Sequence, residues 1–268
     1  KARKINLING TATFSSDKEL KIKTKKGIIE ATFDRAIIAT GSTSSGIPFL
    51  PKGNKKILNS RKALELANIP KKLLVVGGGY IGLEMGSVFS ALGSKVTIVE
   101  RLPHLLDGID RDLVEPLHKK LSKQTEKIYL NTKITSANPK KEGVEVLLER
   151  DGKIIKESFD AILESVGRKP NTKNMTIKNA GLEVNSRGFI KTNNKQQTSI
   201  PTIYAIGDVA GEPMLAHKAA YEGIIAAENI SGTEGSQFDA RAIPAVVFTN
   251  PEIAWVGLTE TAAKEKSI

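Results

Sequence analysis

The sequence has no cysteine, and this absence excludes disulfides, thiolate metal sites and thiol catalysis within its 268 residues. Histidine is also rare, since His104, His118 and His217 are the only ones. These three lack the spacing of metal ligands, so we expect no metal site. No apolar run reaches the roughly 18 residues that a membrane-spanning helix needs. The N-terminus shows no signal peptide either, so we expect a cytoplasmic protein that contacts no membrane.

The positive charge is concentrated at one end of the sequence. The formal net charge is +11, and residues 1–72 alone hold 16 Lys and Arg against 5 Asp and Glu. Lys21, Lys23 and Lys25 alternate with other residues, which is typical of the solvated face of a strand. The alternative is a surface for an acidic partner or for RNA. No aromatic residues are interleaved with these lysines, so we expect no nucleic acid as a partner.

Two patterns of secondary structure follow one another along the chain. Short strands are predicted up to residue 40, beginning with one at 5–8, and a linker rich in Gly, Ser and Pro follows at 41–59. From residue 73, apolar strands alternate with helices, with further strands expected at 159–166 and 190–192. This alternation is typical of a parallel sheet with crossover helices, so the sequence predicts an α/β fold.

A G-x-G-x-x-G string follows the strand at 73–76 and opens a helix, which is the context of a dinucleotide-binding turn. Gly77 allows the tight turn, Gly79 lets a pyrophosphate approach the backbone, and Gly82 allows close helix–strand packing. The next strand ends in Glu100, whose carboxylate can accept hydrogen bonds from ribose hydroxyls and repels a 2′-phosphate. We therefore expect NAD rather than NADP. The alternative is a glycine-rich packing turn with a solvated glutamate.

A second strand and turn lie nearer the end of the chain. Residues 202–206 predict a strand that leads into Gly207 and Asp208, and a long helix follows from Leu215. A carboxylate at the carboxyl end of a strand faces the crevice in which α/β folds bind ligands. Alone, Gly-Asp is a common turn, so this motif depends on the others for its meaning.

The motifs together resemble the pyridine nucleotide-disulfide oxidoreductases, and most of all the dihydrolipoamide dehydrogenase branch. In order, they are Ala39-Thr40-Gly41, the turn at 77–82, Gly167-Arg168-Lys169-Pro170-Asn171, Ala205-Ile206-Gly207-Asp208 and Met214-Leu215-Ala216-His217-Lys218-Ala219. Residues 244–257 resemble the start of that family's dimer-interface domain. The resemblance implies an α/β fold of two Rossmann-like units, with an NAD domain inserted in a partial FAD domain and the start of an α+β interface domain. The implied boundaries are 1–60 (FAD), 61–182 (NAD), 183–240 (FAD) and 241–268 (interface).

The resemblance also implies roles for individual residues. Asp208 would bind the ribityl chain of FAD, and Glu84 would lie near the nicotinamide. The residues implied to bind NAD are Gly77, Gly78, Gly79, Tyr80, Ile81, Gly82, Glu84, Glu100, Ile134, Ser165, Val166, Gly167 and Arg168. Those implied to bind FAD are Ala12, Thr40, Gly41, Asp208, Met214, Leu215, Ala216 and His217. Glu164 departs from the family, which usually has an apolar residue there.

The resemblance implies that electrons pass from dihydrolipoyl groups through a cysteine pair and FAD to NAD. The cysteine pair and the His-Glu base would both lie outside this sequence, so we expect both ends to continue in a longer polypeptide and this chain alone to be inactive. The implied partners are a second copy in a homodimer and lipoyl-bearing subunits of 2-oxoacid dehydrogenase complexes or of glycine cleavage. One alternative is another NAD(P)-dependent flavin disulfide reductase or NADH oxidase of the same fold. The other is a non-catalytic nucleotide-binding assembly subunit.

Overall fold

The computed structural model describes residues 4–268, which form two compact units. Unit 1 is Lys1–Thr43 with Lys169–Arg241, and unit 2 is Ser44–Arg168 with Ala242–Ile268. The first division falls earlier than the domain boundary expected after residue 60, because Leu50 and Ile57 already belong to a core of unit 2. The last segment also packs within unit 2, where Val247 and Ile253 join a core.

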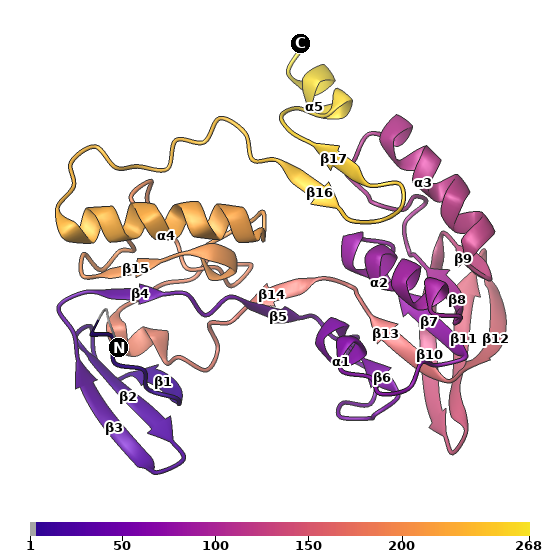
Figure 1. The fold of residues 1–268 in the computed structure, drawn as a ribbon, viewed down its shortest axis with the longest axis horizontal. Helices are drawn as coiled ribbons and strands as arrows, with labels where there is room; N and C mark the ends of the chain where they lie inside the picture. Colours follow the sequence, from indigo (N-terminus) through magenta and orange to yellow (C-terminus); the bar gives the residue numbers. More distant parts are fainter. Residues whose placement is uncertain (1–3) are drawn as a thin grey trace. The chain divides into compact units, whose positions relative to one another are not determined.

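A five-stranded parallel sheet forms the centre of unit 2 (Figure 1). Its order is β6-β13-β7-β8-β9, so β13, the last of these strands in the sequence, lies between β6 and β7. Such crossovers are what parallel pairing requires, because parallel neighbours cannot be joined by a tight hairpin. The strands are β6 (Ile57–Leu58), β7 (Lys72–Val76), β8 (Lys95–Val99), β9 (Lys127–Tyr129) and β13 (Ala161–Glu164).

Both faces of this sheet are covered, and β7 shows why its sequence is apolar throughout. Leu73 and Val75 pack against the helices, whereas Leu74 and Val76 pack against a three-stranded antiparallel sheet. Alternate residues of a strand point to opposite faces, so a strand buried on both sides needs an unbroken apolar run. The covering elements are α1 (Ser60–Leu64), α2 (Tyr80–Ala91) and α3 (Arg111–Gln124) on one side, and β10 (Thr132–Lys140), β11 (Gly143–Arg150) and β12 (Lys153–Phe159) on the other.

Unit 1 is built around a parallel pair, β4 (Ala36–Ile38) and β15 (Ile203–Ala205). Ile38, Ile203 and Ala205 of this pair are buried in one core with Phe14 of β1. The remaining elements are β1 (Thr11–Phe14), β2 (Glu19–Thr24) and β3 (Gly27–Thr32), which form an antiparallel sheet, the 3₁₀ turns η1 (Ile177–Ala180) and η2 (Gly207–Val209), and the long helix α4 (Ala216–Ser231).

Four short strands and one helix complete the chain. β5 (Ser42–Ser44) pairs with β14 (Arg168–Pro170), and both strands span a boundary between the two units. β16 (Ala245–Val247) and β17 (Ile253–Trp255) form an antiparallel pair, and α5 (Glu260–Glu265) ends the chain. Within residues 4–268, no helix has the length and apolarity to cross a membrane.

Several expectations about local structure are wrong. Residues 5–8 form no strand, and the side chains of Ile5 and Leu7 are exposed. The expected linker at 41–59 contains β5 and β6, and β6 is buried because it forms an edge of the parallel sheet. The strand expected at 190–192 is reduced to a single bridge between Val184 and Ile190.

The strand expected at 159–166 is instead the end of β12 and the whole of β13. Asp160 separates them: its backbone N–H donates to the Lys72 carbonyl at 2.9 Å, and its carboxylate accepts from the Lys72 N–H at 2.8 Å. The chain thereby leaves the antiparallel sheet and enters the parallel one. The sequence does not predict β12 because most of its side chains, in Lys-Ile-Ile-Lys-Glu-Ser-Phe, are at least partly exposed.

We predict that Gly82→Ala destabilises the protein by about 1–3 kcal/mol, the usual cost of overpacking. A Cβ on Gly82 would lie 2.1 Å from the Gly77 carbonyl oxygen and 2.6 Å from the Ser165 hydroxyl. Gly86→Ala is the matched control on the same helix, since its Cβ would meet Val96 at an ordinary 3.6 Å. Because alanine favours helix, the control should leave stability unchanged or raise it by up to about 1 kcal/mol. Urea unfolding of both variants tests this, and equal midpoints would refute it.

Candidate functional site

The turn between β7 and α2 uses its three motif glycines in different ways. Gly77 has φ +110°, and a Cβ there would lie 2.5 Å from the Ser165 carbonyl oxygen. Gly82 is needed for contact between α2 and this turn. A Cβ on Gly79, in contrast, would meet nothing within 4 Å among the described residues. Packing and φ therefore account for Gly77 and Gly82, whereas Gly79 leaves open the space that a ligand phosphate would occupy.

The start of α2 offers hydrogen-bond donors to this open space. Gly79 is the N-cap residue, and glycine has no side chain with which to cap the helix. The first N–H groups of a helix have no partner within the helix, and the helix dipole places positive potential at this end. Tyr80 and Ile81 are the first helical residues, and Tyr80 is partly exposed. The turn and helix start together fit a pyrophosphate.

Glu100 directly follows β8 and is hydrogen-bonded through both carboxylate oxygens. Oε2 accepts from the Gly78 N–H at 2.6 Å, and Oε1 accepts from the Leu102 N–H at 2.7 Å. A carboxylate has about four acceptor positions, so each oxygen keeps one for a ribose hydroxyl. Besides the predicted role toward ribose, Glu100 thus fixes Gly78 within the turn, and the sequence does not predict this second role.

The other residues expected at the NAD site are spread over several elements of unit 2. Ser165 follows β13, and its hydroxyl donates to the Val76 carbonyl at 2.8 Å, which places it beside the glycine turn. Val166 is partly exposed, and the Gly167 carbonyl accepts from the Ser45 N–H at 2.8 Å. Arg168 begins β14.

Two expected NAD-site residues make contacts that the sequence does not indicate. Ile134 of β10 is 9% exposed and packs in the core between the two sheets. The Glu84 carboxylate, on α2, accepts a hydrogen bond from the Phe248 N–H at 2.8 Å. This bond ties the glycine-turn helix to the segment after β16. The roles of both residues toward a nucleotide stay predictions.

Glu164 has a structural role that the sequence analysis does not predict, since there it is noted only as an acidic residue where the family usually has an apolar one. It ends β13, and its Oε1 accepts from the Ile47 N–H at 2.8 Å. A polar side chain in an apolar strand is acceptable here because the carboxylate satisfies a backbone donor. An acidic residue within an otherwise apolar strand was the available sequence signal.

In unit 1, two of the predicted FAD motifs meet at one edge of the parallel pair. Thr40-Gly41 and Gly207-Asp208 each begin two residues after the last residue of β4 and β15. The Asp208 Oδ2 accepts from the Ser42 hydroxyl at 2.5 Å. Asn171 is bonded to the same segment, since its N–H donates to the Gly41 carbonyl at 2.9 Å. The edge is therefore the place where an α/β fold binds a ligand.

The remaining FAD candidates lie on two other elements of unit 1. Met214 and Leu215 precede α4, and Ala216 and His217 are its first residues. The N-cap residue is Leu215, which makes no side-chain hydrogen bond to the helix. Ala12 lies in β1 opposite Ile22, in the antiparallel sheet rather than at the edge that carries Asp208.

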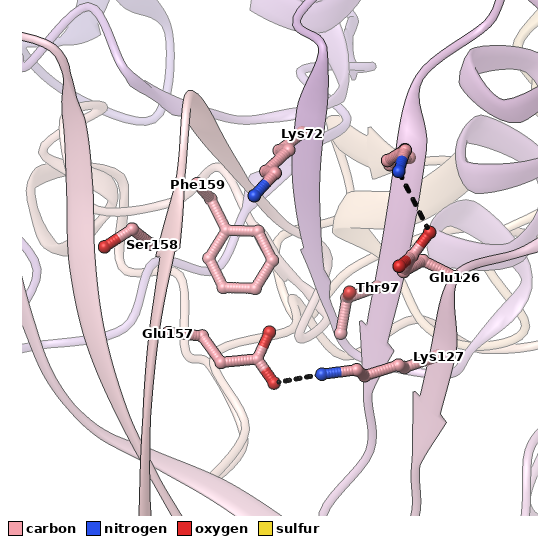
Figure 2. Close-up of a pocket in the computed structure, with 8 residues that line it drawn as sticks. Lys72, Thr97, Glu126, Lys127, Glu157, Ser158 and Phe159 are labelled. Atoms are coloured by element: carbon pink, nitrogen blue, oxygen red, sulfur yellow. Dashed lines mark hydrogen bonds and ion pairs between the residues drawn. The ribbon is translucent and has the colours of Figure 1, made fainter.

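A cavity of about 310 Å³ lies at the amino edge of the parallel sheet, opposite the edge that carries the glycine turn (Figure 2). Lys72, Lys95 and Lys127 line it from the first residues of β7, β8 and β9. α/β folds bind nucleotides at the carboxyl ends of their strands, so this cavity is not the expected NAD site. Its other lining residues are Thr97, Glu126, Glu157, Ser158 and Phe159.

The charges around this cavity pair with one another. Glu157 lies 2.9 Å from the Lys127 ammonium and accepts from the Tyr129 hydroxyl at 2.6 Å. Burial raises the pKa of Glu157, but the hydrogen bonds from Tyr129 and Lys127 outweigh burial and lower it below the ordinary value. A second ion pair joins the Lys95 ammonium to the carboxylate of Glu126, at 4.0 Å; Glu126 is labelled in Figure 2. These contacts account for most of the cavity's charge.

Residues 4–268 contain no group of three or more His, Cys, Asp or Glu side chains placed to hold a metal.

Family models cover almost the whole chain. Residues 1–223 match the model described as pyridine nucleotide-disulphide oxidoreductase, and residues 243–268 match the dimerisation domain of the same family. The chain belongs to the pyridine nucleotide-disulphide oxidoreductase family. The predicted resemblance is confirmed, and so is the α/β fold with Rossmann-like units. Membership also confirms FAD and a pyridine nucleotide as cofactors.

Several curated relatives are dihydrolipoyl dehydrogenases. The chain is 42% identical to dihydrolipoyl dehydrogenase of Vibrio cholerae over 269 residues, 45% identical to that of Buchnera aphidicola over 270, and 39% identical to that of Bacillus subtilis over 269. Each alignment covers 100% of this chain but only 56% or 57% of the relative. The chain therefore spans little more than half the length of these relatives.

Solved structures show the same family. The HOCl-induced flavoprotein disulfide reductase RclA from Escherichia coli matches this chain with a TM-score of 0.88 at 30% identity. The match covers 97% of this chain and 59% of the RclA chain. LpdA from Mycobacterium tuberculosis matches with a TM-score of 0.85 at 28% identity, and the match covers 97% of this chain and 57% of the LpdA chain. These names agree with the expectation of a flavoprotein oxidoreductase.

We predict that Gly79→Ala weakens binding of NADH by roughly tenfold or more while changing stability by less than about 1 kcal/mol. Its φ of −80° is open to alanine, and the added Cβ would meet no described atom within 4 Å. Any loss must then come from a clash with the ligand. Titration of NADH against both Gly79→Ala and the control Gly86→Ala measures this. Wild-type affinity in Gly79→Ala would show that the pyrophosphate lies elsewhere.

Proposed function

We propose that the intact protein is a dihydrolipoyl dehydrogenase that oxidises dihydrolipoyl groups and reduces NAD. The observation that carries this proposal is the pair of ligand-facing strand edges: the Gly77–Gly82 turn with Glu100 in unit 2, and the Gly207-Asp208 turn in unit 1. The names of the curated relatives support it. FAD, when bound, supplies two-electron transfer between a dithiol and a nicotinamide.

The chain's own residues contribute binding and position. Gly78 and Gly79 and the start of α2 take the NAD pyrophosphate, and Glu100 accepts from the adenosine ribose. At this position a 2′-phosphate would meet a carboxylate, so NAD is favoured over NADP. Asp208 would hold the ribityl hydroxyls of FAD, and residues 214–217 at the start of α4 would contribute backbone groups to the flavin site. The redox cysteines and the His-Glu base belong to parts of the intact protein outside this sequence.

The proposed partners follow from the same assignment. The family match to a dimerisation domain over residues 243–268 supports a homodimer. Lipoyl-bearing subunits of 2-oxoacid dehydrogenase complexes, or of glycine cleavage, are the proposed electron donors. The cytoplasmic location stays a prediction.

A disulfide reductase of the same fold with another substrate is the second candidate, because RclA matches the fold with a TM-score of 0.88. The Met214–Ala219 motif favours the first candidate, since Leu-Ala-His-Lys-Ala resembles the dihydrolipoamide dehydrogenase branch. The higher identity of the dihydrolipoyl dehydrogenases, at 39–45% against 30% for RclA, points the same way.

The activity of the intact protein decides between these candidates. We expect NAD reduction by dihydrolipoamide, with little NADPH-dependent reduction of glutathione disulfide. The present chain alone, given FAD and NAD, should not reduce NAD with dihydrolipoamide, because thiol–disulfide exchange requires a cysteine sulfur on the enzyme and this sequence has no cysteine. Absence of dihydrolipoamide oxidation by the intact protein would refute the proposal.

Glu100→Ala should weaken NADH binding by about 1–2 kcal/mol, the scale of one or two hydrogen bonds to a charged group. NADPH affinity should fall less or rise, because the carboxylate that repels its phosphate is gone. Fluorescence titration with both nucleotides gives the ratio of their dissociation constants in each protein. The assignment fails if the wild type binds NADH and NADPH equally.

A further inference from the structure

Lys218 and Glu222 form an ion pair that is buried inside unit 1. The ammonium and the Glu222 Oε1 are 2.7 Å apart, and the side chains are only 6% and 5% exposed. Removing two charges from water is costly, and their attraction often does no more than offset that cost. A buried pair is therefore weak evidence for a role in stability alone, and its other contacts indicate what it does.

The pair does not serve the helix on which it lies. Lys218 is the third residue of α4, so a positive charge lies at the positive end of the helix dipole. A lysine four residues before a glutamate is also the less favourable order for a helical ion pair. The reason for the pair must come from the residues that α4 packs against.

Both partners make a second contact, and both of these contacts are with the backbone around Asp208. The Glu222 Oε2 accepts from the Gly207 N–H at 2.7 Å, and the Lys218 ammonium approaches the Gly211 carbonyl at 3.4 Å. Gly207 and Gly211 lie on either side of Asp208 in the chain. The pair therefore holds both ends of the short segment that presents this carboxylate.

The turn also packs directly on α4, which leaves little freedom for another arrangement. Gly207 has φ +70°, and a Cβ there would lie 3.1 Å from the Ala219 Cβ. The Gly207 N–H is buried with its glutamate partner, so loss of the carboxylate would leave a buried donor without its acceptor. The turn's conformation thus depends on Glu222, and Glu222 depends on Lys218 for charge balance.

We propose that Lys218 and Glu222 are positioning residues that set Asp208 in the orientation required to bind the ribityl chain of FAD. This inference rests on the proposed function, in which Asp208 binds FAD. The pair touches no flavin atom itself and acts through the backbone of Gly207–Gly211. Its consequence is a separation of two properties: flavin affinity depends on the polar contacts to the turn, whereas stability depends on filling the buried volume.

The test uses the intact protein, stripped of flavin and titrated with FAD, with urea unfolding measured in parallel. Glu222→Gln leaves Lys218 without its carboxylate and should lower FAD affinity by roughly tenfold or more. The double variant Lys218→Met/Glu222→Leu replaces the pair with apolar groups of similar size, which typically leaves stability equal or higher. We expect FAD affinity lowered to a similar extent in the double variant, with a urea midpoint at or above that of Glu222→Gln, because removing both buried charges offsets the loss of the acceptor for the Gly207 N–H. Glu115→Gln, which breaks the exposed pair with Lys119 on α3, is the control and should change neither the FAD affinity nor the urea midpoint.

The outcomes separate this inference from the proposed function. If the wild type binds no FAD, the proposed function fails. If the wild type binds FAD and the double variant binds it equally well, the pair is structural only and the positioning role is overturned. If Asp208→Ala leaves FAD affinity unchanged while the Glu222 variants lower it, the pair does not act through Asp208, and the inference is likewise overturned.

Discussion

In each unit, a glutamate carboxylate accepts a hydrogen bond from a glycine N–H in the turn that follows a parallel strand. In unit 2 Glu100 bonds Gly78 at 2.6 Å, and in unit 1 Glu222 bonds Gly207 at 2.7 Å. Such charge-assisted bonds are roughly twice as strong as neutral ones. Because glycine-rich turns have many accessible conformations, these two bonds fix which one each turn adopts. The groups that face a ligand at both strand edges depend on them.

The two glutamates differ in how their charge is balanced, and the difference follows their proposed roles. Glu222 is buried, paired with Lys218, and has no surface left to meet a ligand. Glu100 has no lysine partner among its hydrogen bonds; its oxygens are stabilised by the N–H groups of Gly78 and Leu102 and keep acceptor positions free. The first carboxylate can only position the turn. The second can position the turn and also select a nucleotide by its ribose.

The glycine positions could be read from the sequence because their reasons are local. Spacing alone separates a tight turn at Gly77 from helix packing at Gly82, and the structure gives Cβ contacts that agree. The turn and loop N–H groups that donate to Glu100, Glu164 and Glu222 could not be predicted. These donors lie 22, 117 and 15 residues away in the chain, outside any local pattern. Strand β12 was missed because its exposed side chains carry little apolar signal, and residues 5–8 show that an apolar run forms no strand without a partner.

Hydrogen exchange read by mass spectrometry tests the central claim, that NAD binds at the turn fixed by Glu100. On the intact protein, added NAD should slow exchange in peptides that cover the Gly77–Gly82 turn, because a pyrophosphate bound there would shield the backbone N–H groups at the start of α2 from solvent. Peptides that cover Lys127 and Glu157, at the other edge of the sheet, should exchange as before. Slower exchange around Lys127 and Glu157, with none at the glycine turn, would contradict the account.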